Sequence, residues 1–298
     1  MSFLEVVSSS QILFAALLTG AVYAIVAVGL NMVYGTMRLL NVAHGDIVMI
    51  GAYGAYWLFT SLGLSPIVSM FVVAAFCALL GAVLYKLLLK KMLGRPGDAA
   101  RLEARSLLLF FGLSLLIQNL VVSLQTATPR AYQYLDHVYR FSDLAMTGNR
   151  ILALGVALVL CLAIAAFLRW NIFGLALRAV IERTDAARIV GVDVERVHLI
   201  SLAIGFGAAG VAGVLISMME QFSPFMGFSL TIAAFIVVIL GGLGNIAGGF
   251  AAAMILGAIE TYGVALTSPN MRSILLYGVF VLSLILLPKG LFHKWLRK

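Results

Sequence analysis

The sequence predicts an all-α, polytopic helical membrane protein with about nine spans, in a range of roughly eight to ten. Hydrophobic residues make up 63% of the 298 residues, charged residues make up only 11%, and the mean hydropathy is +1.09. A soluble domain could not bury this much apolar surface. Because lipid offers no hydrogen bonds, each span must pair its backbone groups internally, as a helix does. The whole chain, 1–298, is therefore predicted to be a single transmembrane domain.

Apolar runs between charged, proline or glycine breaks set the bounds of the predicted spans. They are 11–34, 41–62, 66–89, 106–126, 151–169, 198–219, 229–244, 247–267 and 272–288. The second span opens with a polar cluster. The seventh runs into the segment 241–249, which is too rich in glycine for an ordinary helix interior. Either of these two is expected to be a broken or re-entrant helix.

Basic residues gather in alternate connections between the predicted spans. One group lies in the loops 90–105 and 170–197 and in the C-terminal tail: Lys90, Lys91, Arg95, Arg101, Arg105, Arg178, Arg183, Arg188, Arg196, Lys289, Lys294, Arg297 and Lys298. The positive-inside rule makes this group cytoplasmic, which places the N-terminus outside and the C-terminus inside. The net charge of +8 therefore indicates topology and contact with anionic lipid, and nucleic-acid binding is not expected.

Polar side chains crowd into one window near the second span, although the surrounding sequence is almost wholly apolar. The window, residues 29–57, includes Asn31, Arg38, Asn41, His44 and Asp46, with Gly45 among them. Polar groups at membrane depth survive mainly where they face a cavity, a partner or an interface. We therefore expect them to line part of a transport path, with Arg38 and His44 near enough to pair with Asp46. The alternative is a capped helix start at the membrane surface, with Asp46 in its first turn.

The pattern of residues 41–45 recurs in type at 245–249, and a glycine-spaced apolar run follows both. Transporters often contain repeated halves whose broken helices meet at the substrate path. If the repeat is real, the two segments approach each other near the midplane, and their small residues leave room for cargo. Chance similarity in a glycine-rich chain is the alternative. The predicted substrate path consists of Asn41, His44, Gly45, Asp46, Asn245, Gly248 and Gly249.

No arrangement of residues in the sequence indicates an enzyme or a metal site. The four histidines are scattered without ligand spacing, and Cys77 and Cys161 lie inside apolar runs, as packing residues do. No motif for nucleophilic or metal-assisted hydrolysis falls at matched depth. Glu260, near the predicted outer end of its span, needs a buried partner or must reach the interface. We expect no catalytic residue, metal ion or cofactor in this chain.

The longest connection predicted on the cytoplasmic side, 170–197, has an amphipathic pattern. Apolar Leu177, Ile181 and Val190 are interleaved with arginines and acidic residues. Such segments form short helices that lie against a membrane or a partner. The alternative is a solvated hairpin that joins two spans, although the loop lacks the serine and proline bias of a passive linker.

Three segments, in order along essentially the whole chain, resemble permeases of ABC importers. The residues DAARIVG, 185–191, match the spacing of the EAA loop of such permeases, with Asp185 in place of the usual Glu. The segments 34–53, where Val42 replaces the usual aromatic residue, and 242–260 resemble signatures of the LivH-type branched-chain amino acid permease family. The loop residues that the resemblance assigns to ATPase coupling are Asp185, Ala186, Ala187 and Gly191.

The resemblance implies a permease subunit of the bacterial inner membrane that has no motor of its own. The sequence contains no G-x-x-x-x-G-K-[ST] phosphate loop, so ATP would be bound by partner subunits. The implied partners are a second homologous permease, two ATP-binding subunits and a periplasmic or extracellular substrate-binding protein. Loop 170–197 would sit in an ATPase groove, and cargo would arrive at 127–150 and 220–228. Rival interpretations are a similar importer for urea or short amides and a self-sufficient ion-coupled carrier.

Overall fold

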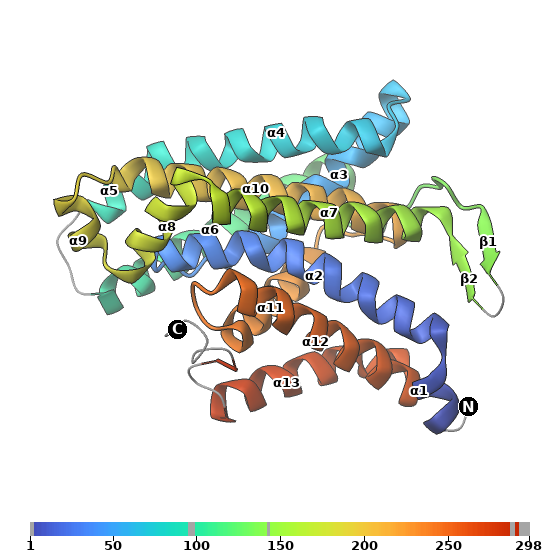
Figure 1. Cartoon of the computed structure of the whole chain (residues 1–298). Helices are drawn as coiled ribbons and strands as arrows, with labels where there is room; N and C mark the ends of the chain where they lie inside the picture. Colours follow the sequence, from blue (N-terminus) through green and yellow to red (C-terminus); the bar gives the residue numbers. More distant parts are fainter. Residues whose placement is uncertain (1–2, 95–98, 142–143, 287–289, 292–298) are drawn as a thin grey trace.

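Figure 1 shows the computed structural model of the chain, an elongated bundle of helices with a small β-hairpin at one end. The structure describes residues 3–94, 99–141, 144–286 and 290–291. The long helices are α2 (Ser10–Met37), α3 (His44–Leu62), α4 (Pro66–Leu84), α6 (Ala99–Gln125), α7 (Gly148–Trp170), α10 (Val194–Met219), α11 (Met226–Gly241), α12 (Ile246–Leu266) and α13 (Arg272–Leu286). The short ones are α1 (Phe3–Ser8), α5 (Lys90–Leu93), α8 (Ile172–Glu182) and α9 (Thr184–Ile189). A π-helical turn, Tyr85–Leu89, joins α4 to α5, and a 3-10 turn, Pro269–Met271, precedes α13.

Each predicted span overlaps a helix, and the all-α, polytopic class is confirmed. Within the described residues, seven helical stretches are long and apolar enough to cross a membrane. α11 has only 16 residues, and α3, with 19 residues, begins with polar side chains that lower its mean hydropathy. These two helices are the spans that the sequence marks as unusual.

α2 is the central helix of the bundle, and every one of its residues from Gly20 to Met37 is buried. It packs against α12, α10, α11 and α7, while α10, the second internal helix, packs against α4, α3 and α2. α2 and α10 approach so closely that a β-carbon at Gly29 would strike the backbone of Gly205. Small residues permit this contact, and close packing stabilises helix pairs in lipid, where no hydrophobic force draws them together.

The connection between α2 and α3 folds back into the bundle. Arg38 ends α2 with a left-handed backbone, φ 54°. The chain then returns along α2, so that Nε2 of His44, at the start of α3, donates a hydrogen bond to the carbonyl of Val26, 2.9 Å away. Leu39 and Asn41 in this segment are fully buried. Non-helical backbone at such depth is tolerated where protein covers it, and the second predicted span is thus a broken element.

A tight turn between α11 and α12 makes a second break. Gly242 and Gly244 have φ values of 90° and 82°, which residues with side chains rarely adopt. A β-carbon at Gly244 would meet the side chain of Ile181 in α8. The glycine-rich end of the seventh predicted span is therefore this turn, and α11 stops before it.

Figure 1 places α5, α8 and α9 at one end of the bundle, called here the basic end. At the opposite end, called the hairpin end, lie α1 and the strands β1 (Val138–Phe141) and β2 (Leu144–Thr147), which pair antiparallel. Nζ of Lys90 lies 2.8 Å from Oε2 of Glu195, which ties the loops 90–105 and 170–197 to the same end, as the charge pattern predicts. The basic residues of the C-terminal tail lie outside the described residues. The hairpin was not predicted.

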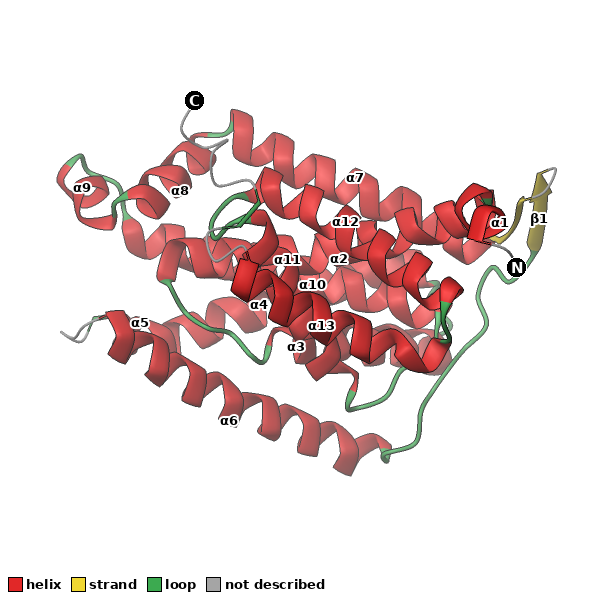
Figure 2. Cartoon of the chain, turned by 90° about the horizontal axis from the view of Figure 1, so that it is seen from below, coloured by secondary structure: helices red, strands yellow, loops and turns green. Residues whose placement is uncertain are grey.

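α6 and α13 lie at the periphery of the bundle. Figure 2 shows α6 running along one edge, with a long loop leading from it to β1. Many of its large apolar side chains are exposed, including Leu108, Leu116 and Leu124. Only 11% of the most apolar stretch of α13 is buried. Exposed apolar faces that extend along whole helices suit contact with lipid or with another membrane subunit.

Candidate functional site

The start of α3 is fixed to α11 through one hydroxyl group. Oγ1 of Thr231 accepts a hydrogen bond from the backbone N–H of Gly45, 2.8 Å away. The same hydroxyl lies 3.0 Å from the carbonyls of Val42 and Gly227, either of which can accept its proton. A β-carbon at Gly45 would overlap the carbonyl of Gly227. Gly45 is therefore a contact residue between two helices.

Asp46 lies in the first turn of α3 and is buried, with 1% of its surface exposed. Its Oδ1 accepts a hydrogen bond from Nε2 of Gln118 in α6, 3.1 Å away. The helix dipole favours a carboxylate at this position. The expected pairing of Asp46 with Arg38 or His44 is not found, because His44 bonds to α2 and Arg38 lines a separate cavity.

Asn41 and His44 retain polar atoms without partners. The side-chain amide of Asn41 and Nδ1 of His44 are buried and have no hydrogen bond to the part of the chain that the structure describes. Buried polar groups in native proteins are nearly always paired. Of the predicted path residues, these two therefore have polar atoms available for cargo, water or a partner chain.

The second break is held to α2 by the side chain of Asn31. Its Oδ1 accepts a hydrogen bond from the N–H of Gly244, at 2.7 Å, and its Nδ2 donates one to the carbonyl of Asn245, at 2.9 Å. Asn245 caps α12, because its Oδ1 accepts from the N–H of Gly248 at 2.9 Å. A β-carbon at Gly248 would overlap the carbonyl of Gly241, and one at Gly249 would crowd Asn31.

The two predicted path segments are joined through α2 and α11. The first bonds to α2 at Val26 and the second at Asn31, positions less than two helical turns apart. Both segments also pack against α11, near Gly227 and Gly241 respectively. The polar residues at the two breaks are thus attached to the same central helix, although they are about 200 positions apart in the chain.

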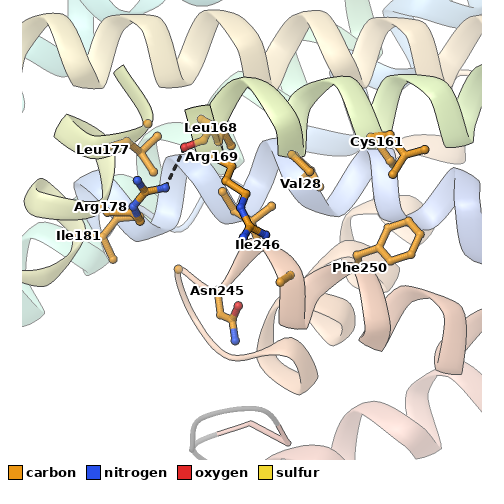
Figure 3. A pocket seen from close by; sticks show the side chains of 15 residues that line it. Val28, Cys161, Leu168, Arg169, Leu177, Arg178, Ile181, Asn245, Ile246 and Phe250 are labelled. Carbon is orange, nitrogen blue, oxygen red and sulfur yellow. Dashed lines mark hydrogen bonds between the residues drawn. The ribbon is translucent and has the colours of Figure 1, made fainter. Parts of the chain in front are cut away.

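A cavity of about 440 Å³ lies between α2, α7, α8 and the start of α12 (Figure 3). Most of its walls are apolar, and they include Val28, Cys161, Leu177, Ile181 and Phe250. Arg169, Arg178 and Asn245 supply its polar groups. Nη1 of Arg178 donates a hydrogen bond to the carbonyl of Leu168 at 2.8 Å. The side chain of Arg169, in contrast, makes no ion pair or hydrogen bond with the described residues. The cavity can therefore offer a free guanidinium and the N-terminus of α12 to an anionic group.

One residue of α8 contacts both this cavity and the second break. Ile181 packs against Gly35 of α2 and against Gly244 in the turn before α12. It also lines a second cavity of about 480 Å³, on which Arg38 and Tyr34 lie. Because Ile181 lines both cavities, a displacement of α8 would alter a wall of each.

α8 is folded tightly onto the end of α7. Oδ1 of Asn171 caps α8 by accepting from the N–H of Phe173, at 2.8 Å. A β-carbon at Gly174 would overlap the backbone of Leu168 in α7. Arg178 closes the same junction through its bond to Leu168. The amphipathic loop is thus two short helices at the basic end, in agreement with the interpretation of its sequence pattern.

The DAARIVG segment forms α9 and the turn that ends it. Asp185 lies exposed in the first turn, Ala186 is exposed and Ala187 is buried. Gly191 ends the helix with φ 89°, and the N–H of Val192 bonds to the carbonyl of Ala187 at 3.0 Å, as in a Schellman motif. Just before it, Ile189 and Val190 are 86% and 77% exposed. α9 therefore presents a protruding apolar tip beside charged side chains.

Comparison with known proteins relates the whole of this architecture to one family. Residues 12–284 match the family described as "Branched-chain amino acid transport system / permease component". The permease LivH of the high-affinity branched-chain amino acid transport system of Escherichia coli K12 is 30% identical over 293 residues, which cover 94% of either chain. BraD of Pseudomonas aeruginosa, a permease of the same description, is 28% identical and covers 96% of either chain. A probable LivH of Methanocaldococcus jannaschii is 27% identical over 97% of this chain and 94% of its own. No solved structure gave a significant match.

The chain belongs to the branched-chain amino acid permease family. The family match and the 30% identity to LivH confirm the sequence-based assignment to the LivH type, and the matched relatives are transport permeases. The match spans every element from α2 to α13. Both breaks and the α8–α9 hairpin therefore lie within the family region of this permease.

Sequence reasoning expected a buried partner for Glu260, but it missed the polar residues that the fold brings to Glu260 and to the start of α3. Glu260 is 4% exposed, pairs with Nε of Arg272 and accepts a hydrogen bond from the hydroxyl of Tyr23 at 2.6 Å. Of the two arrangements expected for Glu260, the structure therefore shows the buried partner and not a carboxylate that extends to the membrane interface. Gln118 and Thr231, which hold Asp46 and Gly45, were also overlooked. These partners come from distant elements, and no local pattern could have indicated them.

Proposed function

We propose that this chain is the membrane-spanning permease subunit of an ABC importer. It forms, as a single transmembrane domain, part of the path for branched-chain amino acids across the bacterial inner membrane. Separate ATP-binding subunits drive the transport, and a second homologous permease and an external substrate-binding protein complete the complex. The basic end faces the cytoplasm, with the N-terminus outside and the C-terminus inside, because the arginine-rich loops lie there.

The observation that carries this proposal is the contact between α8 and the second break. Ile181 touches the turn at Gly244, and Asn31 bonds that turn to the central helix α2. A partner that pushes on α8 and α9 would therefore displace the start of α12 and reshape the cavities on both sides of α8. Packed elements move between discrete arrangements, so a small push can switch a gate.

The exposed tip of α9 is the surface that we assign to the ATPase. Ile189 and Val190 supply apolar contacts, and Asp185 supplies a charge. Ala186 and Ala187 line a groove between α8 and α9, together with Ala179 and Val190, and their small side chains let a second surface approach it. Gly191 sets the direction of the chain after α9. The amphipathic face of a short helix in a groove is a common mode of recognition.

The substrate path runs along α2 past the two breaks. Asn41, His44 and Asn245 are its polar side chains, and Asp46 positions the start of α3. Gly45, Gly248 and Gly249 allow the broken helices to pack closely. The cavity of Figure 3 suits a small hydrophobic amino acid, because its walls are apolar while Arg169 and the N-terminus of α12 favour a carboxylate.

Uptake of labelled leucine tests the proposal. Deletion of the gene for this chain in its own host should abolish high-affinity leucine uptake, and expression of the chain should restore it. Competition by isoleucine and valine but not by urea or acetamide would support the assigned cargo. Unchanged leucine uptake in the deletion strain, or restored uptake of urea alone, would overturn it.

A further inference from the structure

A small cavity of about 150 Å³ lies at the hairpin end of the bundle, between α2, α7, α10, α11 and α13. Its charged residues are Arg150 of α7, Glu220 at the end of α10 and Arg272 of α13. Its apolar walls come from Leu18 and Val22 of α2 and Leu230 of α11. The cavity therefore combines charges of both signs with a surface for an aliphatic side chain.

The charges on this cavity are unequally engaged. Arg272 pairs with buried Glu260, which also accepts a hydrogen bond from Tyr23. The charge of this arginine is therefore balanced by the carboxylate of Glu260. Glu220 lies 3.8 Å from Nη1 of Arg272, at the outer limit of an ion pair, and its side chain is 56% exposed. The side chain of Arg150 has no ion pair or hydrogen bond with any residue that the structure describes. One cation and one anion thus remain available to a ligand.

Both available charges stand where the helix dipole disfavours them. Arg150 is the third residue of α7, at the positive end of that helix, and Glu220 caps the negative end of α10. The dipole stabilises the opposite charges at these positions. The positive end of α7 therefore adds to the positive charge of Arg150, and the negative end of α10 adds to the negative charge of Glu220. An anion at Arg150 or a cation at Glu220 would be stabilised by the side chain and by the helix end together.

We propose that this cavity binds a free zwitterionic amino acid as it arrives from outside, before it passes along α2. Arg150 binds the α-carboxylate, Glu220 binds the α-ammonium, and Leu18, Val22 and Leu230 contact the side chain. The identity of the cargo rests on the proposed function. The new part of the proposal is the set of residues that recognise this cargo. Arg272, held by Glu260, orients Glu220.

Two substitutions that remove a charge but keep a polar side chain test the site in the complete transporter. In Arg150→Gln and Glu220→Gln, the KM for leucine uptake should rise at least tenfold while membrane-resident protein and Vmax stay near the original values. Arg101→Gln is the matched control, since Arg101 is an exposed arginine at the start of α6, outside this cavity and outside the segments where cargo is expected to arrive. Unchanged KM in both variants, while leucine uptake still depends on the chain, overturns the site and leaves the transport function standing.

Direct binding separates the site from the assigned cargo. The full chain in lipid nanodiscs should bind labelled leucine, and excess leucine should displace it. Leucinol, which lacks the carboxylate, and 4-methylpentanoate, which lacks the ammonium, should displace it at least tenfold less well. If leucine fails to bind but another zwitterionic amino acid binds, and both variants abolish that binding, the site stands and the cargo is wrong. Equal displacement by the one-charge analogues, or binding that neither variant weakens, overturns the site.

Discussion

Asn31 illustrates how one side chain can specify a break in a membrane helix bundle. Both ends of its amide are used, one by the N–H of Gly244 and the other by the carbonyl of Asn245. Without this residue the two backbone groups would lose their partners inside the bundle, and an unpaired buried group costs about 1–3 kcal/mol. A polar residue inside α2 is therefore retained because it satisfies the backbone of another element.

Gly45 should tolerate no side chain, because a β-carbon there overlaps the carbonyl of Gly227. Gly45→Ala should destabilise the protein by about 1–3 kcal/mol or more, and membrane-resident protein and melting temperature should both fall. Gly112→Ala in α6 is the control, since no atom lies within 4 Å of the place that its added methyl group would occupy. Fluorescence-detected size exclusion with heating measures both variants. If Gly45→Ala has normal stability but loses uptake, the packing role is wrong and Gly45 lines the path instead.

At the scale of elements, the α8–α9 hairpin extends from the end of the bundle and leaves an apolar surface uncovered. α9 packs through Ala187, while the apolar tip at Ile189 and Val190 stays exposed. Exposed apolar residues beside a membrane protein's basic end are typical of a surface that another subunit covers. The α8–α9 hairpin also reaches inward through Ile181, so a partner bound at its tip would act on the proposed path.

Ile189→Asp and Asp185→Lys should uncouple ATP hydrolysis from transport. The aspartate removes an apolar contact and the lysine reverses a charge at the ATPase surface, so leucine uptake should fall at least tenfold while membrane-resident protein stays constant. Leu62→Asp also replaces an exposed apolar residue by aspartate, but at the end of α3 and away from α9, and it should leave uptake unaltered. ATPase subunits retained at normal levels, together with normal uptake in both α9 variants, would remove α9 from the coupling surface.

The elements themselves were largely predictable, whereas their pairings were not. Apolar runs located every long helix, and the glycines near 242 and the polar cluster near 41 marked the two breaks. The partners of Asp46 and Glu260 could not be predicted, since Gln118 and Tyr23 are distant in sequence and conform to ordinary helix patterns. The β-hairpin was missed because its two four-residue strands lie in a loop without clear alternation.

At the scale of the whole molecule, the two ends of the bundle differ in charge and in structure. Basic residues dominate the end with α5, α8 and α9, and the hairpin end carries the mixed charges of Arg150, Glu220 and Arg272. The first pattern suits the cytoplasmic face and its anionic lipid, and the second suits a neutral zwitterion arriving from outside.

Labelling of single cysteines tests this orientation. In a background without the buried Cys77 and Cys161, a cysteine at Gln133 should react with a membrane-impermeant maleimide in intact cells, because the segment 127–150 is expected outside. A cysteine at Ala100 should react only after the cells are opened. The reverse pattern would invert the whole topology and with it the assignment of the α9 surface to the cytoplasm.

The central claim is that this permease carries branched-chain amino acids only when separate ATPases drive it. Proteoliposomes that contain the chain, its partner permease, the ATP-binding subunits and the substrate-binding protein should accumulate leucine when ATP is supplied to the ATPases. Liposomes with the chain alone should not accumulate leucine in response to an ion gradient, and neither should the complete complex without ATP. Leucine accumulation by the chain alone under a proton or sodium gradient, or ATP-independent accumulation by the complex, would contradict the account.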